Sequence, residues 1–459
     1  MEIAYYKIRD GLTTNLTLKN IRTGIRCMIY IIADDLTGAN DTGVQFAKKG
    51  YKTLVSVSDK IGFLPTPEDV EVWVIDTETR ELADKTAREK LKGILSTIKV
   101  HKKDIVYKKV DSTLRGNIGA ELEEIMKILP RDLCMFSPSY PFYHRITVGG
   151  YLVVGQQPLG LSEYAGNNLR PVPVEDYFIP FLLKKQTALP VAQLDLKEVA
   201  KGGKAILLKL NELYQRGDKI IVIDSTAEEH LKDIWLSGLE FEGTVLFSGS
   251  AGLANHFPYV GNKYKEEGLK INLENNQSPV IVVAGSRNLL MEEQVNYLKN
   301  RLSFTELKID LESIFTNREA LLASYVTQGI KALQDKQDLI IHTNALYHEK
   351  HSINKKLMLK YQLSFRELEL KLKTFLGELV SKLVENSGAR NLILTGGDVA
   401  VGVCAALGLH NLYILDELLP GIPLSLAKGK NFKLNMITKA GGFGKEDTLY
   451  NLINKLRNY

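Results

Sequence analysis

The sequence has few cysteines and no long apolar run. Its 459 residues include three cysteines, Cys27, Cys134 and Cys404, which lie far apart and form neither a CxxC motif nor a Cys/His ligand pattern. This usage is typical of a reducing compartment, so we predict a cytoplasmic protein whose Cys134 and Cys404 belong to the core. No apolar run is long enough to span a bilayer, so we expect no membrane partner.

An excess of one charge is also missing. The chain has 59 basic and 54 acidic residues and a net charge of +5, which is too balanced to indicate nucleic-acid binding. It contains no Gly-x-x-x-x-Gly-Lys-[Ser/Thr] segment, and no Gly-x-Gly-x-x-Gly opens a helix. The His-Arg-Asp and Asp-Phe-Gly segments of protein kinases are missing as well. A P-loop and a protein kinase are therefore excluded.

Length and composition indicate a two-domain globular protein. A chain of 459 residues exceeds one ordinary hydrophobic core, and 44% apolar with 25% charged residues is typical of soluble globular proteins. Residues 261–278 are rich in Lys, Glu and Asn and lack periodicity, so we predict a linker there between domains at 28–260 and 279–459. Residues 1–27 lack the apolar region of a signal peptide, and we predict a loosely packed extension or an upstream start-codon artefact.

The stretch from residue 29 to residue 41 carries the first chemical feature. An apolar run of strand length, residues 29–33, delivers Asp34 and Asp35, and a glycine-bearing turn and a helix follow. Open α/β sheets bind ligands at the carboxyl ends of their strands. Alternation along an extended chain predicts that the two carboxylates point to opposite sides. One would face a substrate hydroxyl, and the other would cap the helix or orient its neighbour. Taken alone, the segment fits a plain helix start equally well.

A second polar cluster follows a strand-like run at residues 104–107. Lys109, Asp111, Ser112 and Arg115 lie where this strand ends, and a helix is predicted to open just after them. Backbone amides and a guanidinium converge at such a turn, which suits an oxyanion.

Two segments resemble the hallmark motifs of a known family. Residues 33–41 (Ala-Asp-Asp-Leu-Thr-Gly-Ala-Asn-Asp) and 109–116 (Lys-Val-Asp-Ser-Thr-Leu-Arg-Gly) are similar to those of the four-carbon acid sugar kinases. The resemblance implies ATP-dependent phosphorylation of threonate, erythronate or 3-oxo-tetronate. It also implies that Arg80, just past a strand-like run at 71–75, contributes to the sugar-acid site, where a carboxylate needs a planar bidentate partner. Without the resemblance, the sequence would indicate that Arg80 is a surface arginine at the start of a helix.

Residues 139–175 lose helical periodicity, and Gly149-Gly150 between apolar segments predicts a hairpin-like excursion. Relatives carry a similar insert, in which Arg145 would contact the substrate, although a solvated loop arginine fits the sequence as well. The insert departs from the family pattern at Ile146, Gly149 and Asn167-Asn168, where threonine, aspartate and Asp-Pro are usual. These departures leave the choice among four-carbon substrates and stereoisomers open.

The C-terminal half contains three glycine-bearing turns, each after an apolar strand: Gly285-Ser286, Thr395-Gly396-Gly397-Asp398 and Gly441-Gly442-Phe443-Gly444. Three such turns on one sheet edge indicate a phosphate-bearing ligand cradled by backbone amides. They resemble the nucleotide-binding domain of the same family. Ser250 lies in a similar small-residue turn, which alone would more simply mark tight packing.

We therefore predict an α/β protein of two domains, each a mostly parallel sheet flanked by helices, with the active site in the cleft between them. The predicted activity is transfer of a phosphoryl group from MgATP to a terminal hydroxyl of a four-carbon sugar acid. Asp35, or less favourably Asp34, is the base or hydroxyl orienter. Arg115 is the third predicted catalytic residue, and with Arg80 and Lys109 it would bind the substrate carboxylate or the transferring phosphoryl group. Asp111 and Ser112 would hydrogen-bond the substrate hydroxyls, and Arg145 would be a further substrate contact. The predicted nucleotide contacts are Ser250, Gly285, Ser286, Gly396, Gly397, Asp398, Gly441, Gly442 and Gly444, with Asp398 also as Mg²⁺ ligand.

Two other functions fit the same sequence. A non-catalytic sugar-acid sensor would keep the N-terminal site without turnover, and an ATP-dependent ligase would act on the carboxylate. The sequence also leaves a homo-oligomer open.

Overall fold

The computed structural model describes residues 27–57, 70–161, 177–258, 273–285, 289–343 and 347–459. The predicted extension at 1–27 lies outside this range except for Cys27, and so does Ser286. The chain divides into two compact units. The first unit comprises Met1–Ile29 and Lys99–Asn262, and the second unit comprises Tyr30–Ile98 and Lys263–Tyr459. No helix within the described ranges is long and apolar enough to cross a membrane.

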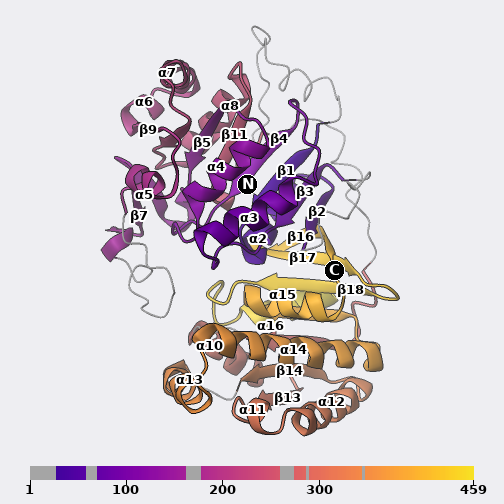
Figure 1. The fold of residues 1–459 in the computed structure, drawn as a ribbon. Coiled ribbons are helices and arrows are strands. Elements are labelled where there is room, and N and C mark those ends of the chain that lie inside the picture. The colour runs from indigo at the N-terminus through magenta and orange to yellow at the C-terminus, as the bar shows by residue number, and fades with distance from the viewer. Residues whose placement is uncertain (1–26, 58–69, 162–176, 259–272, 286–288, 344–346) are drawn as a thin grey trace. The chain divides into compact units, whose positions relative to one another are not determined.

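The first unit is built around five parallel strands. In spatial order they are β4 (Ile105–Lys109), β11 (Val245–Gly249), β5 (Leu133–Ser137), β10 (Ile220–Ile223) and β9 (Val191–Leu194). Every residue of β4, β11, β5 and β10 is buried, as expected for parallel strands covered on both faces. The helices are α4 (Ile118–Ile128), α5 (Ile179–Gln186), α6 (Leu196–Val199), α7 (Gly203–Gln215), α8 (Glu228–Glu240) and α9 (Ala251–Asn255) (Figure 1).

An antiparallel hairpin extends from this sheet's carboxyl edge. Strands β6 (Arg145–Val148) and β7 (Tyr151–Val154) pair across the turn at Gly149-Gly150, and β8 (Gln157–Pro158) adds to β7. Short 3₁₀ turns, η2 (Pro141–Tyr143) and η3 (Leu159–Leu161), flank the three strands. The hairpin predicted within residues 139–175 is thus confirmed.

The second unit holds a larger mixed sheet. Its strand order is β13 (Phe304–Ile309), β14 (Asp338–Thr343), β12 (Val280–Ala284), β15 (Asn391–Thr395), β18 (Lys433–Lys439), β17 (Ile422–Lys428), β16 (Asn411–Leu419), β2 (Thr53–Ser56), β3 (Val72–Asp76) and β1 (Ile29–Ala33). Strand β17 runs antiparallel to β18 and β16, and β16 runs antiparallel to β2. The pairs from β13 to β18 and the β2–β3 pair are parallel.

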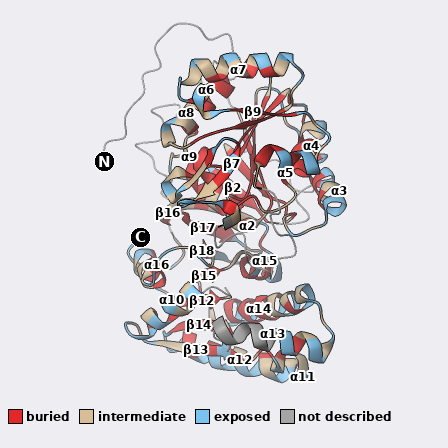
Figure 2. Ribbon diagram, turned by 90° about the vertical axis from the view of Figure 1, so that its left-hand side faces the viewer, coloured by how far each residue is buried: buried red, intermediate tan, exposed pale blue. Residues whose placement is uncertain are grey.

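Helices line this second sheet and bury their apolar sides. They are α2 (Leu36–Ala47), α3 (Asp84–Leu95), α10 (Leu289–Lys299), α11 (Ser313–Thr316), α12 (Arg318–Gln334), α13 (Tyr347–Tyr361), α14 (Phe365–Ser387), α15 (Gly397–Ala406) and α16 (Thr448–Arg457). A capping box of Ser364 and Glu367 starts α14, and Gly388 in the left-handed conformation ends it. Figure 2 shows buried residues along the central strands and exposed residues along the outer helices.

The predicted fold class is confirmed, and the buried positions of Cys134 and Cys404 are confirmed with it. Two features were not predicted: the β16–β17 hairpin, and the pairing of β16 with β2. Through this pairing, residues 30–98 belong to the same compact unit as the C-terminal part of the chain. The domain bounds at 28–260 and 279–459 stay a prediction.

Candidate active site

A single arginine joins both members of the acidic pair. Arg80 Nε and Nη2 lie 3.0 and 2.7 Å from the two carboxylate oxygens of Asp34, while Nη1 and Nη2 lie 2.6 and 2.7 Å from those of Asp35. The prediction that the two carboxylates point to opposite sides is therefore wrong. Strand β1 ends at Ala33, so strand alternation no longer applies where the chain turns into α2.

Two carboxylates hold the first turn of α2. Asp35 caps the helix and accepts the Gly38 N–H at 2.9 Å, while Glu78 accepts the Leu36 N–H at 3.1 Å. The side chain of Asp35 is 22% exposed and that of Asp34 only 3%. Asp35 is therefore the more accessible carboxylate of the pair, and its role as the base stays a prediction.

Negative charge accumulates around Glu78. Burial raises the pKa of Glu78 to about 7, Lys373 opposes the shift, and the carboxylates of Asp35 and Asp398 add to it. Burial, Glu78 and Asp35 likewise raise the pKa of Asp76 well above its usual range. Glu78 also has a left-handed backbone, with φ of +45°, which is uncommon for a residue other than glycine.

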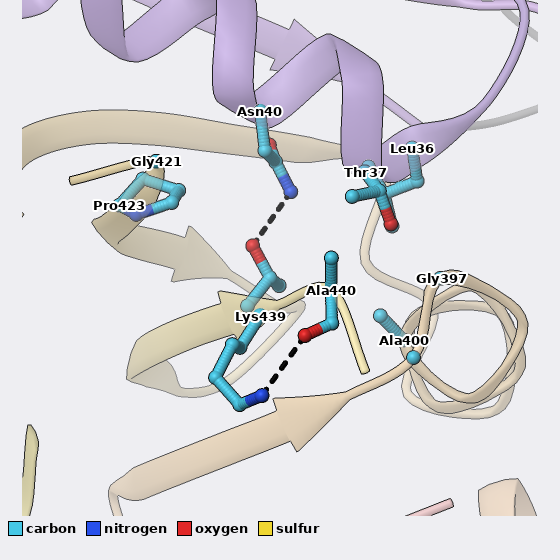
Figure 3. A pocket seen from close by; sticks show the side chains of 11 residues that line it. Leu36, Thr37, Asn40, Gly397, Ala400, Gly421, Pro423, Lys439 and Ala440 are labelled. Carbon is cyan, nitrogen blue, oxygen red and sulfur yellow. Dashed lines mark hydrogen bonds between the residues drawn. The ribbon is translucent and has the colours of Figure 1, made fainter. Parts of the chain in front are cut away.

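A small pocket lies beside the first turn of α2, within the second unit (Figure 3). The start of α2 forms one wall, and the glycine turn that follows β15 and the end of β18 form another. The lining residues are Leu36, Thr37, Asn40, Gly396, Gly397, Ala400, Gly421, Pro423, Thr438, Lys439 and Ala440. Asn40 is buried, and its Nδ2 donates to Thr438 Oγ1 at 2.8 Å, whereas its Oδ1 has no hydrogen-bond partner within the described ranges.

The turn before α15 leaves the helix amides open to a ligand. Gly396, with φ of +94°, is the N-cap residue and offers no side chain to the first amides of α15. Its own N–H donates to the backbone oxygen of Lys439 at 2.9 Å, which ties this turn to the end of β18. Helix N-termini attract anions, and the exposed Asp398 lies in the first turn.

The remaining glycine turns flank this one. Gly285, at the end of β12, packs on α15 so closely that an added Cβ would lie 2.1 Å from Val399 Cγ2. The turn of Gly441, Gly442 and Gly444 follows β18 directly, and Lys439 Nζ donates to three of its carbonyl oxygens. Burial lowers the pKa of Lys439 to about 7.

The first unit assembles the second predicted cluster. Asp111 accepts from Arg115 Nε and Nη2 at 2.5 and 2.7 Å, and Arg145 Nη1 donates to Ser112 Oγ at 2.9 Å. Because β4 and β11 pair in register up to Lys109 and Gly249, the turns after both strands begin at the same sheet edge. Lys109 is buried and donates to the backbone oxygen of Val110 at 2.8 Å.

Ser250 also lies in the first unit. Its hydroxyl donates to the backbone oxygen of Ser139 at 2.8 Å and accepts the Gly252 N–H at 3.0 Å, which caps α9. These bonds account for the small-residue turn as a packing feature, and a role for Ser250 at the nucleotide stays a prediction.

Comparison with known proteins identifies a sugar-binding part and a nucleotide-binding part in this chain. A model of a sugar-binding N-terminal domain matches residues 29–257, and a model of a nucleotide-binding C-terminal domain matches residues 281–449. A D-threonate kinase from Salmonella typhimurium is 33% identical over 427 residues, which cover 92% of this chain and 96% of that protein. The chain belongs to the four-carbon acid sugar kinase family. The resemblance carried by residues 33–41 and 109–116 is thereby confirmed.

Other members of the family differ in substrate. A D-erythronate kinase from Heliobacterium modesticaldum is 29% identical and covers 91% of this chain and 94% of its own. A 3-oxo-tetronate kinase from Pseudomonas fluorescens is 25% identical and covers 94% and 97%. A crystal structure from Salmonella typhimurium LT2, at 22% identity and a TM-score of 0.75, covers 93% of this chain and 98% of its own and shows the same fold.

Three of the predicted site arginines follow residues with a left-handed backbone. Glu78, Leu114 and His144 have φ of +45°, +61° and +55°, and they precede Arg80, Arg115 and Arg145 by one or two residues. Left-handed residues other than glycine concentrate at functional sites, where the surrounding structure holds them. No sequence pattern for this conformation was available, because none of the three is Gly, Asn or Asp.

Sequence reasoning missed several residues of the pocket and of the hairpin's anchor. Thr37 and Asn40 reach the pocket from one face of α2, and Lys439 reaches it from the end of β18. Asp224 accepts the amides of Gly149 and Gly150 at 2.7 and 2.9 Å and so anchors the hairpin that carries Arg145. A carboxylate directly after the apolar run of β10 was the available pattern for Asp224.

Proposed function

We propose that this chain transfers the terminal phosphoryl group of ATP to the terminal hydroxyl of a four-carbon sugar acid, namely threonate, erythronate or 3-oxo-tetronate. The observation that carries the proposal is the pocket at which the start of α2, next to Asp35, meets the glycine turn before α15.

Asp35 is the proposed base. Its exposed carboxylate can accept a hydroxyl proton, while Arg80 and the Gly38 N–H fix its orientation. Because Arg80 already binds both carboxylates of the pair, its main proposed role becomes the positioning of Asp35. Phosphoryl transfer depends chiefly on such positioning and on neutralisation of charge.

The proposed acid-binding groups lie in the first unit. Arg115 and Arg145 supply planar guanidinium groups for the substrate carboxylate, and Asp111 and Ser112 supply acceptors for its hydroxyls. Lys109 adds a buried positive charge at the end of β4. The hairpin anchored by Asp224 holds Arg145 in place.

Asp398 fits the requirements of a magnesium ligand. Its carboxylate is exposed at the start of α15, and its negative charge contributes to the raised pKa of Glu78. Mg²⁺ is typically held by one or two carboxylates and by substrate phosphates, with several waters retained. We propose that Asp398 holds the ion directly or through water, and that the ion neutralises charge on the ATP phosphates.

A coupled assay for ADP release tests the proposal. The purified protein is supplied with MgATP and with D- and L-threonate, D- and L-erythronate and 3-oxo-tetronates in turn. We expect release of ADP with one or a few of these acids and none without acid. A protein that is stabilised by acid but not by ATP in a melting assay would be a sensor, and AMP as product would indicate a ligase.

A further inference from the structure

Four buried hydroxyl groups form a chain at the carboxyl edge of the first unit's sheet. Ser137 ends β5, Ser139 lies two residues further on, Ser225 follows β10, and Thr147 is the third residue of β6. The Oγ atoms of Ser137 and Ser225 lie 2.7 Å apart, and Ser225 Oγ donates to Ser139 Oγ at 2.8 Å. Ser139 Oγ in turn lies 2.8 Å from Thr147 Oγ1. The chain therefore connects the sheet to the hairpin.

The backbone of β6 is bound at the same edge. Thr147 and Ser225 exchange two N–H···O bonds of 2.9 Å each. Arg145 and Tyr140 exchange two further bonds, of 3.1 and 2.7 Å. Every residue except proline can form such backbone bonds, so they hold the strand without selecting which side chains face the sheet. That selection depends on the side chains themselves.

Thr147 and Arg145 lie two positions apart on β6, so their side chains share one face of the strand. The buried hydroxyl of Thr147 makes this face the inner one, while Val148, on the other face, is 38% exposed. A shift of the strand by one residue would bring Ile146 or Val148 to the place of Thr147 and turn Arg145 outward. The Ser139 hydroxyl would then lose its partner on β6, and a buried polar group without a partner is costly.

We propose that Thr147 is a positioning residue of the acid site, whose buried hydroxyl fixes the register of β6 so that Arg145 faces Ser112. In this register Arg145 Nη1 donates to Ser112 Oγ, in the turn after β4, at 2.9 Å. Thr147 is fully buried, so it acts through Arg145 and not by contact with the acid. The inference rests on the proposed function, because it takes Arg145 as a contact of the four-carbon acid.

Thr147→Val removes the hydroxyl and keeps the branched shape of the side chain. With an acid that the wild-type protein phosphorylates, the KM for that acid should rise on the order of tenfold, because a displaced Arg145 loses its contact geometry. The KM for ATP should stay within about twofold of wild type, and Thr147→Ser, which keeps the hydroxyl, should restore the KM for the acid to within about threefold. Thr244→Val is the matched control, since it loses a hydroxyl bond to Asp132 just before β11, at the opposite edge of the same sheet, and should change neither KM.

Hydrogen exchange measured by mass spectrometry follows the hairpin without turnover. The amides of residues 145–154 should exchange on the order of tenfold faster in Thr147→Val and at the wild-type rate in Thr147→Ser and Thr244→Val. An unchanged KM for the acid, equal rises in both KM values, or unchanged hairpin exchange in Thr147→Val would each overturn the proposal. If that variant does not fold, Ser139→Ala, which removes the other partner of the same bond, decides by the same criteria. If the wild-type protein releases ADP with none of the acids, the proposed function is wrong instead, and the exchange rates alone decide whether Thr147 fixes the hairpin.

Discussion

Gly397 at the start of α15 lies directly against Thr37 in the first turn of α2. A Cβ added at position 397 would come within 2.8 Å of Thr37 Oγ1, closer than such atoms approach in folded proteins. The two turns that line the pocket therefore fit together only because position 397 has no side chain. This contact is the point at which the acidic pair and the glycine turn become one site.

Gly397→Ala should displace Thr37 and narrow the pocket. We expect the KM for ATP to rise on the order of tenfold, since a small shift of a binding turn changes contact geometry throughout the site. Thr37→Ala removes the atom that clashes, so the alanine at 397 should cost much less in that background. Steady-state kinetics of both single variants and of the double variant measure the coupling. Strict additivity of the two effects would show that the contact does not matter.

Asp35→Asn should remove the negative charge of the carboxylate and keep the shape of the side chain, so it tests the charge alone. Asparagine is also a good N-cap residue and keeps an acceptor for the Gly38 N–H, so the helix start should remain intact. We expect kcat to fall on the order of 10²-fold or more, as for loss of a positioned base. Asp195→Asn, which alters the N-cap residue of α6, is the control and should leave kcat unchanged. An Asp35→Asn kcat within a few-fold of wild type would rule out the base.

Arg80→Lys should destabilise the protein although it keeps the charge. Lysine cannot form the forked bonds to two carboxylates, and the nearly buried Asp34 would lose its bidentate partner. We expect a loss of about 2–3 kcal/mol in the free energy of unfolding, measured by urea denaturation. Arg88→Lys changes an exposed helical pair with Asp84 and should cost below about 0.5 kcal/mol. Equal losses for the two variants would contradict the positioning role.

Arg145→Met should affect the acid and not the nucleotide. Removal of the guanidinium that lies against Ser112 should raise the KM for the four-carbon acid roughly tenfold to a hundredfold, because a charged hydrogen bond is lost. The KM for ATP should stay within about twofold of wild type. Arg216→Met, which removes an exposed ion pair with Asp218 in the same unit, should alter neither value. If only the KM for ATP rose, the proposal that Arg145 binds the four-carbon acid would be wrong.

Glu78→Gln should change the pH dependence of stability. The pKa of Glu78 is about 7 in the folded protein, against about 4.5 in the unfolded chain, so the folded state binds the extra proton between these values. Wild-type stability should therefore fall as the pH rises from 4.5 to 7, by roughly 2–3 kcal/mol from this group. The glutamine variant should lose that slope and exceed the wild type in stability at pH 7–8. Urea denaturation across this pH range is the measurement, and an unchanged slope would contradict it.

The local elements follow from the sequence because their causes are local. The apolar run at 29–33 predicts a strand, and the glycine turns at 396–397 and 441–444 are predicted where the structure has them. The residue types of the candidate site can also be recognised in the sequence, because Asp-Asp before a helix and Ser-Thr-x-Arg-Gly after a strand are short contiguous motifs. The family resemblance depends on these same motifs.

Only the tertiary structure decided which of these groups meet. Strand β16 pairs with β2 across more than three hundred residues, and no local propensity encodes such a partner. That pairing and the turn of the chain at Asp35 bring Thr37 to Gly397 and both aspartates to Arg80. The lowered pKa of Lys439 and the raised pKa of Glu78 arise from burial, which depends on packing by distant segments and not on neighbouring residues.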